Sequence, residues 1–407
     1  MIDFKILKLG DDYVVTERIK RMTPSATIEL EGTVAELKAA GVNVIGLNVG
    51  EPDFNTPENI VKACEKAIEN GQTKYVSVAG IMPLRKAISK KLKEDNNVDY
   101  EPKEIVVSTG AKQALYNALL TICNPGDEVI IPTPCWVSYV EMVKLADAVP
   151  VLVNTEENYQ LDIEAIEKAI TPKTKAIIIN TPNNPTGAVY EENSLYSLGR
   201  LAVNNDFYVI SDEVYEKLIY DGSKHICIAS FSEDIKAHSI IINGFSKTYS
   251  MTGWRIGYSA APLDIAKGIA SLQGHTTSNS TTFVQWAAIE ALEGPSDTIE
   301  FMRKKFDERR VYLLERLRKM PGITCSNADG AFYLLPDVSS YFGKSAGDKH
   351  IKDSFDFCSY MLEDAHLAIV PGAAFEAPRT VRIAYSNSIE NIKEGMDNME
   401  KALAKLE

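Results

Sequence analysis

Three stretches of the sequence decide the fold: KAIIINTPNNPTG at 175–187, FYVISDEVY at 207–215 and SIIINGFSKTYS at 239–250. Each begins with a short apolar run, typical of a buried strand, and continues directly into a polar loop. Helical periodicity fills the intervals, for example in EENSLYSLGRLAVNND at 191–206. Strands that alternate with helices predict an α/β fold with a mainly parallel central sheet flanked by helices.

Further apolar runs extend this pattern along the chain. We predict four more strands of the same sheet: EIVVST at 104–109, DEVIIP at 127–132, AVPVLV at 148–153 and WRIGYS at 254–259. After residue 295 the pattern changes to a long charged amphipathic helix at 297–320 and a short strand at 380–386. We therefore expect a large domain at 51–294 and a small α+β domain at 295–407, with residues 1–50 packed on the small domain.

Composition and charge exclude several classes of protein. The 407 residues are 45% hydrophobic and 24% charged, close to the average soluble globular protein. A formal charge of -13 disfavours a nucleic-acid partner. The start of the sequence lacks the apolar core of a signal peptide, and no apolar run reaches the roughly 20 residues that cross a bilayer, so we expect a cytoplasmic protein without membrane contact. Six cysteines without a CxxC pair and five histidines without HExxH spacing favour neither a disulfide framework nor a metal site.

Polar residues follow several of the predicted strands. The carboxyl ends of parallel strands share one rim of a sheet, so Asn184, Asp212, Tyr215 and Lys247 can meet there. A buried lysine near a cation becomes a nucleophilic amine, and a buried carboxylate needs a partner such as a protonated pyridine nitrogen. Taken singly, a lysine after a strand is more often solvated, and SDE at a strand end is commonly a helix N-cap. Only the combination favours a catalytic site.

A second group of residues suits a phosphate. VVSTGAKQAL at 106–115 places Gly110 where a strand meets a helix, and free amides at a helix N-terminus bind anions. Ser246 and Arg255 add a hydroxyl and a bidentate donor close to Lys247. The alternative for these two residues is an N-cap serine and a surface arginine.

Read in order, NTPNNPTG, SDEVY and GFSKTYSMTGWRIGY closely resemble the class I aminotransferases, which are fold type I enzymes that use pyridoxal 5'-phosphate (PLP). The resemblance runs from MTPSAT at 22–27 to VRIAYS at 381–386 and so covers nearly the whole chain. Within this family the sequence looks most like the bacterial and archaeal type of aspartate aminotransferase.

The resemblance implies a role for each matching residue around the cofactor ring. Lys247 would form the Schiff base and move the proton at the substrate α-carbon, and Asp212 would pair with the pyridinium nitrogen. Tyr215 and Asn184 would bind the phenolic oxygen of the ring, and Trp136 would stack on its face. Without the resemblance, Trp136 would be assigned to the apolar core.

The resemblance also implies contacts to the phosphate and to the substrate. The phosphate cup would consist of Gly110, Ala111, Lys112, Ser246 and Arg255, with Tyr75 and Ser278 reaching across a homodimer interface. Arg382 would bind the substrate α-carboxylate, with contacts from Gly50, Trp136 and Asn184, although a structural salt bridge is the alternative for a buried arginine. Lys112, Ser25 and Thr27 would close over an acidic side chain.

The expected function is a PLP-dependent aminotransferase that moves the amino group between aspartate and 2-oxoglutarate by a ping-pong mechanism. An aromatic or prephenate aminotransferase and a PLP-dependent carbon-sulfur lyase are alternatives, because the cofactor residues are shared. A cofactor-sensing regulator is disfavoured because no basic helix-turn-helix segment precedes residue 22. A nicotinamide oxidoreductase is disfavoured because no GxGxxG opens a helix after a predicted strand.

Overall fold

The apolar runs form one seven-stranded sheet in a computed structural model that describes residues 15–23 and 26–407, without the side chains of residues 26–28. Its strands lie in the order β2-β8-β7-β6-β5-β3-β4. Their bounds are β2 Ile105–Ser108, β3 Glu128–Thr133, β4 Val149–Asn154, β5 Thr174–Asn180, β6 Tyr208–Asp212, β7 Ser239–Gly244 and β8 Gly257–Ala260. The largest departure from the predicted bounds is in β8, which starts after Arg255 because that residue has a left-handed φ of 55°.

Strand direction in this sheet explains how distant residues meet. β8 pairs antiparallel with both β2 and β7, whereas β3, β4, β5, β6 and β7 pair in parallel. The carboxyl ends of the six other strands therefore share one rim, and the residues just before β8 lie at that rim as well. The mainly parallel sheet that the sequence predicted is confirmed, with β8 as its one reversed strand.

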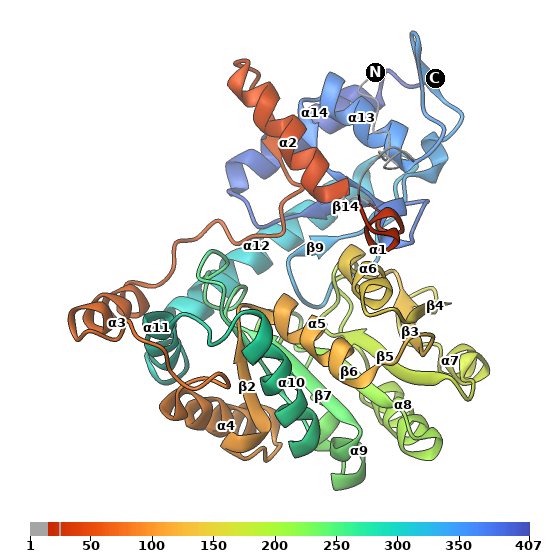
Figure 1. Cartoon of the computed structure of the whole chain (residues 1–407). Helices are drawn as coiled ribbons and strands as arrows, with labels where there is room; N and C mark the ends of the chain where they lie inside the picture. Colours follow the sequence, from red (N-terminus) through yellow and green to blue (C-terminus); the bar gives the residue numbers. More distant parts are fainter. Residues whose placement is uncertain (1–14, 24–25) are drawn as a thin grey trace.

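Helices cover both faces of the sheet (Figure 1). On one face lie α5 Ala111–Ile122, α6 Val137–Leu145 and α10 Leu263–Thr276. On the other face lie α3 Glu58–Glu69, α4 Met82–Asn96, α7 Ile163–Ala169, α8 Glu192–Asn205, α9 Glu233–Ala237 and α11 Thr282–Glu293. Strand side chains alternate between the faces: in β7, Ile240 and Ile242 pack with the first group and Ile241 with the second. Each fully buried Ile contributes roughly 1.5–3 kcal/mol, so both faces stabilise the sheet.

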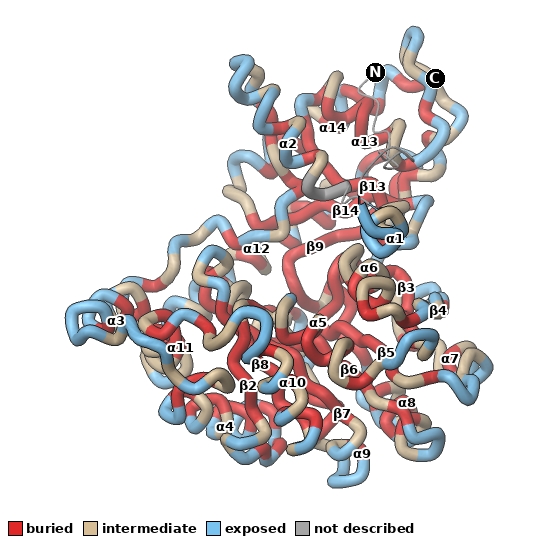
Figure 2. The backbone as a smooth tube through the Cα atoms, viewed as in Figure 1, coloured by how far each residue is buried: buried red, intermediate tan, exposed pale blue. Residues whose placement is uncertain are grey.

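The C-terminal third packs around a smaller sheet. This region contains α12 Asp297–Lys319, β9 Tyr333–Leu334, β10 Ser345–Ala346, β11 Lys349–His350, α13 Ser354–Asp364, β12 Leu367–Ala368, β13 Val370–Pro371, β14 Val381–Ala384 and α14 Ile389–Leu403. The strands β13, β14 and β9 form an antiparallel sheet. The red parts of the backbone tube in Figure 2 mark buried residues in this region and around the large sheet.

The start of the described chain contacts both regions. α1 Glu17–Lys20 is followed by Arg21, and both Arg18 and Arg21 form ion pairs with Asp147, next to β4. α2 Ala26–Ala39 buries Leu30 in a cluster with residues of α13 and β13, and β1 Ile45–Gly46 pairs with β12. The division of the chain at residues 50 and 294 stays a prediction.

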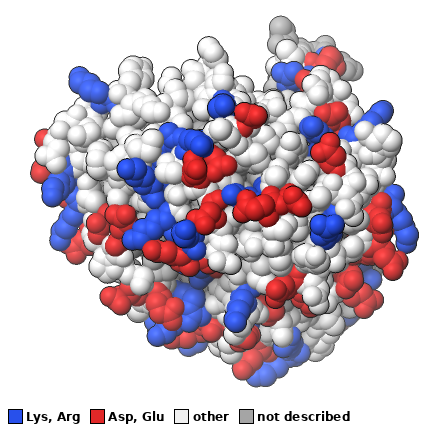
Figure 3. All heavy atoms as spheres, turned by 90° about the horizontal axis from the view of Figure 1, so that it is seen from below, with Lys and Arg blue, Asp and Glu red and all other residues white. Residues whose placement is uncertain are grey.

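The surface of the protein carries charges of both signs. Lys and Arg are interspersed with Asp and Glu over the face seen from below in Figure 3. In residues 15–23 and 26–407, no helix combines the length and apolar character needed to cross a membrane.

Candidate active site

A cavity of about 340 Å³ lies at the carboxyl rim of the large sheet, beside the small one. Asn180 and Asp212 end β5 and β6, and Lys247 follows β7. The lining also includes the beginnings of α5 and α6, the residues before β8, and Tyr333 and Arg382 from β9 and β14. The common direction of the parallel strands has therefore brought together residues that are far apart in the sequence.

Asp212 is a buried carboxylate at the bottom of this cavity. Its Oδ2 accepts a hydrogen bond from the Tyr139 hydroxyl at 2.8 Å, and its Oδ1 accepts one from the Val214 N–H at 3.3 Å. Burial raises the pKa of Asp212 to about 6, although these two donors and the charge of Lys247 oppose the rise. Among the described residues, no cationic side chain forms an ion pair with Asp212, so the carboxylate can accept a cation from the cavity.

Lys247 supplies an amine in the same cavity. Its Nζ donates to the Gly50 carbonyl oxygen at 2.6 Å. Burial lowers the pKa of Lys247 to about 8; Arg382 and Arg255 lower it further, whereas Glu51 and Asp212 raise it. A considerable fraction of the amine is therefore neutral near physiological pH, as a nucleophile requires.

Arg382 is buried against neutral acceptors. Its Nη1 donates to Asn184 Oδ1 at 3.1 Å, its Nη2 donates to the Asn48 carbonyl oxygen at 2.6 Å, and its Nε is buried without a partner. Burial lowers the pKa of Arg382. Among the described residues no carboxylate forms an ion pair with it, which argues against the structural salt bridge and leaves the guanidinium available for an anionic ligand.

The opposite end of the cavity is built for an anion. Gly110 caps α5 with a φ of 88°, and a Cβ at this position would lie 2.6 Å from Arg255 Nη2. A Cβ on Gly257 would lie 2.4 Å from the Ala111 nitrogen. The two glycines therefore allow the N-terminus of α5, with its free N–H groups, to approach Arg255 closely. This arrangement can hold a phosphate.

Lys112 and Trp136 form the side of the cavity. The Lys112 Nζ lies 4.6 Å from the centroid of the Trp136 ring, and the Trp136 and Tyr139 rings meet edge to face at 5.3 Å. Burial lowers the pKa of Lys112, and the charge of Arg255 adds to that effect. A cation stacked on an aromatic ring is well placed to contact an acidic ligand.

Comparison with known proteins identifies the family. The profile of the family described as "Aminotransferase class I and II" matches residues 42–399. The chain belongs to this family. It is an aminotransferase, as the sequence motifs predicted.

Individual relatives of this aminotransferase are similar over almost their full length. An aspartate aminotransferase of Bacillus sp. (strain YM-2) is 46% identical over 390 residues, which are 95% of this chain and 98% of that protein. A probable aspartate/prephenate aminotransferase of Aquifex aeolicus is 44% identical over 96% of this chain and 99% of that protein. The structure of an aspartate aminotransferase from Thermus thermophilus with maleate superposes with a TM-score of 0.90 at 40% identity, covering 96% of this chain and 100% of the other.

Most of the predicted site residues of the aminotransferase lie at this cavity. Its lining includes Gly50, Ala111, Lys112, Trp136, Asn184, Asp212, Tyr215, Ser246, Lys247, Arg255 and Arg382. Gly110 adjoins it through Arg255. Tyr75, which is 90% exposed, and Ser278 do not line it. Ser25 lies outside the described residues, and so does the side chain of Thr27.

Sequence reasoning missed several lining residues. Tyr139 follows Trp136 by three positions, so its place on the same helix face was a usable signal. Asn180 begins the motif NTPNNPTG at 180–187 and Asn48 precedes Gly50 by two positions, but neither was predicted to line the cavity. Tyr333, whose hydroxyl lies 2.8 Å from that of Tyr215, has no local signal because the packing of the two sheets brings it there.

Proposed function

We propose that this aminotransferase binds PLP in the cavity and transfers the amino group between aspartate and 2-oxoglutarate. The observation that carries the proposal is the presence, in one cavity, of the Lys247 amine and of a buried Asp212 carboxylate that has no cationic partner among the described residues. An aromatic ring that carries a cationic nitrogen and an aldehyde can pair with Asp212 through the nitrogen and react with Lys247 through the aldehyde.

The donor set fits PLP at each of its ends. Asp212 suits the protonated ring nitrogen, and the N-terminus of α5 with Arg255 suits the phosphate, in the space that Gly110 and Gly257 leave open. Trp136 supplies an aromatic face. PLP, when bound, supplies an electron sink for the charge that develops at the substrate α-carbon.

Other residues of the chain would move a proton, hold the ring and bind the substrate carboxylate. Lys247 would supply the amine that condenses with the aldehyde, and the same amine would move the proton from the substrate α-carbon to the C4' carbon of the cofactor. Tyr215, whose hydroxyl contacts that of Tyr333, and Asn184 hold the phenolic oxygen of the ring. Arg382 binds the α-carboxylate, exchanging neutral acceptors for an anion, and Gly50 adds a backbone contact.

Support for an acidic substrate comes from Lys112 and from the relatives. Lys112 lies in the cavity without an ion pair among the described residues and can bind a second carboxylate, with Ser25 and Thr27 closing over it. The similar proteins are described as aspartate aminotransferases, and one structure contains the dicarboxylate maleate. Prephenate is the second candidate substrate, because the Aquifex aeolicus relative is described as acting on it as well.

We also propose that the enzyme is a cytoplasmic homodimer in which Tyr75 and Ser278 reach the partner's phosphate site. The high exposure of the Tyr75 ring supports an intermolecular role for this residue. All six cysteines are free thiols, which fits a reducing compartment.

Substitution of Lys247 tests the proposal directly. Lys247→Ala should abolish oxaloacetate formation from aspartate and 2-oxoglutarate, together with the visible absorption of the bound cofactor. Lys267→Ala, at an exposed lysine, is the control. A fully active Lys247→Ala enzyme would refute the role of the lysine. Assays with phenylalanine, tyrosine and prephenate rank the substrates, and pyruvate release from cystathionine would instead indicate a lyase.

A further inference from the structure

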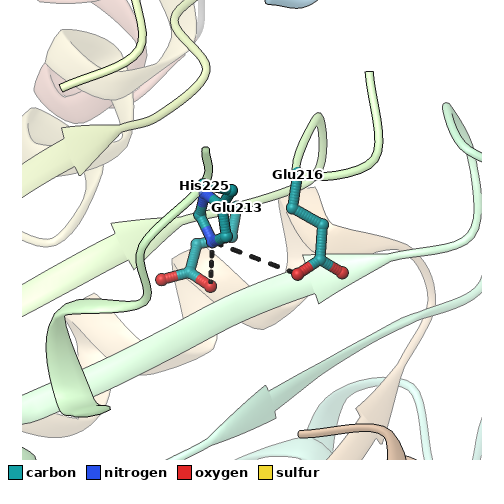
Figure 4. Close-up of side chains that lie close together, drawn as sticks. All are labelled: Glu213, Glu216 and His225. Carbon is teal, nitrogen blue, oxygen red and sulfur yellow. Dashed lines mark hydrogen bonds and ion pairs between the residues drawn. The ribbon is translucent and has the colours of Figure 1, made fainter. Parts of the chain in front are cut away.

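A second polar cluster lies behind Asp212, on the opposite face of the large sheet. Successive side chains at the end of a strand point to opposite faces, so Asp212 faces the cavity whereas Glu213 points into the core. Glu213 is fully buried. Its Oε1 accepts a hydrogen bond from Ser211 Oγ at 2.9 Å, and its Oε2 lies 3.0 Å from His225 Nε2 (Figure 4).

The other carboxylate of this cluster already has a cationic partner. Glu216 accepts a short hydrogen bond from Lys91 Nζ and others from Asn96 Nδ2 and Asn243 Nδ2, at 2.8 and 2.9 Å. His225 Nε2 lies 4.0 Å from Glu216 Oε2. Lys91 therefore offsets the charge of Glu216 rather than that of Glu213.

The two ring nitrogens of His225 have different surroundings. Its Nδ1 is buried and has no hydrogen-bond partner among the described residues. An imidazolium would leave an unpaired buried N–H at Nδ1, whereas the neutral tautomer with its proton on Nε2 leaves only an unused lone pair there. With its proton on Nε2, this ring donates to the Glu213 carboxylate.

The same three side chains have the spacing of metal ligands. One ligand atom each from Glu213, Glu216 and His225 lies within 4.8 Å of the others. However, the Lys91 ammonium is bonded to Glu216 and already provides a positive charge at this place, which would repel a metal ion. The geometry therefore favours a fixed carboxylate over a metal centre.

The charge balance of the cavity gives this carboxylate a role. The lining contains four cationic side chains, Lys112, Lys247, Arg255 and Arg382, but only two carboxylates, Glu31 and Asp212. Such a lining disfavours a cationic ring nitrogen. We infer that Glu213 is a positioning residue that acts through Asp212: its fixed negative charge behind the sheet favours the protonated form of a heteroaromatic nitrogen bound at Asp212.

Lys91 is the lysine among the titratable groups around Glu213, and its positive charge is paired with Glu216. Beside the cavity-facing Asp212, the titratable or charged groups near Glu213 are Lys91, Tyr100, Glu216, His225, Cys227 and Tyr258. Burial raises the pKa of the Tyr100 and Cys227 side chains, so both stay neutral. Burial is also the main reason for the raised pKa of Asp212, and the charge of Glu213 adds to it.

This inference rests on the proposed function and has a test that does not depend on turnover. The probes are PLP and its analogue in which C–H replaces the ring nitrogen, and the measurement is the dissociation constant of each from the apoprotein. Glu213→Gln keeps the shape of the side chain and one acceptor oxygen but removes its charge. It should weaken PLP binding about tenfold and leave the analogue within about twofold of wild type, since a tenfold change corresponds to one pKa unit.

Two further variants separate charge from shape. Glu213→Asp and His225→Gln both keep the carboxylate, so both should keep the wild-type ratio of PLP to analogue affinity, whatever thermal stability they lose. The inference would be overturned by equal losses for the two probes in Glu213→Gln, by an unchanged PLP affinity, or by a stoichiometric metal that this variant no longer binds. If wild-type protein binds neither probe, the proposed function itself fails.

Discussion

Removal of the Tyr139 hydroxyl should shift the pH range in which this enzyme holds its cofactor. The hydroxyl donates to Asp212 Oδ2 at 2.8 Å, and only 2% of Tyr139 is exposed. Tyr139→Phe deletes this donor, and water cannot readily replace it at a buried position. Asp212 then keeps only the longer hydrogen bond from the Val214 N–H.

The size of the shift follows from the hydrogen bond that is lost. A hydrogen bond to a charged group contributes about 1.5–3 kcal/mol, and 1.36 kcal/mol corresponds to about one pKa unit. The loss destabilises the ionised form, so the pKa of Asp212 should rise by roughly 1–2 units. Starting from about 6 in the wild type, it should reach roughly 7–8 in the variant.

Cofactor binding to the apoprotein reports this pKa. Only ionised Asp212 pairs with a protonated ring nitrogen, so the affinity for PLP should fall as the pH drops through the pKa of Asp212. The wild-type midpoint should therefore lie near pH 6, and the variant midpoint roughly 1–2 units higher. The dissociation constant can be followed from about pH 5 to about pH 9 by quenching of protein fluorescence, since Trp136 lines the cavity.

Tyr360→Phe is a matched control for this experiment. Its hydroxyl is also buried and also donates over 2.8 Å, but to the Ala402 carbonyl oxygen in the C-terminal region. The control should lose stability without moving the midpoint. Equal midpoints for Tyr139→Phe and the wild type would refute the reasoning, because they would mean that the phenol does not stabilise the ionised carboxylate.

Three other predictions follow from the cavity. Lys112→Ala should lower kcat/KM for aspartate roughly tenfold to a hundredfold and change that for phenylalanine much less; equal losses would remove the case for an acidic substrate. Gly257→Ala places a Cβ 2.4 Å from the Ala111 nitrogen and should raise the dissociation constant of inorganic phosphate, measured by calorimetry, whereas Gly253→Ala, with open space around it, should not. The rate at which the apoprotein takes up PLP should rise with pH and level off above about 8, because the neutral Lys247 amine is the nucleophile; a rate independent of pH, followed by absorbance, would contradict this.

The strands and their common rim could be predicted from the sequence because they depend on local pattern. Apolar runs with β-branched residues, such as SIIIN at 239–243, identify buried strands, and parallel pairing then places their ends together. The reversal of β8 could not be predicted in this way, because no feature of WRIGYS at 254–259 encodes a direction. This reversal matters for the site, since it brings Arg255 to the rim from the start of a strand rather than from its end.

The roles of single residues were harder to predict where tertiary packing decides them. Lys247 and Asp212 stand at strand ends, so their meeting follows from topology. Tyr333 reaches Tyr215 only because β9 of the small sheet packs beside the large one. A sequence pattern describes one element at a time and contains no information on such contacts between elements.

Residues 211–213 (SDE) lie at the end of β6, where neighbouring side chains point to opposite faces of the sheet. Any register that directs Asp212 into the cavity also forces Glu213 into the apolar core, because neighbouring side chains alternate. Burial of a carboxylate costs several kcal/mol, and the hydrogen-bonding partners Ser211 and His225 reduce that cost. A glutamine could accept one hydrogen bond with its oxygen and donate one with its amide nitrogen, without the charge. A buried glutamate at position 213 therefore costs more folding free energy than a glutamine would. We attribute its presence to the electrostatic field of its charge, which acts on the cavity on the other side of the strand.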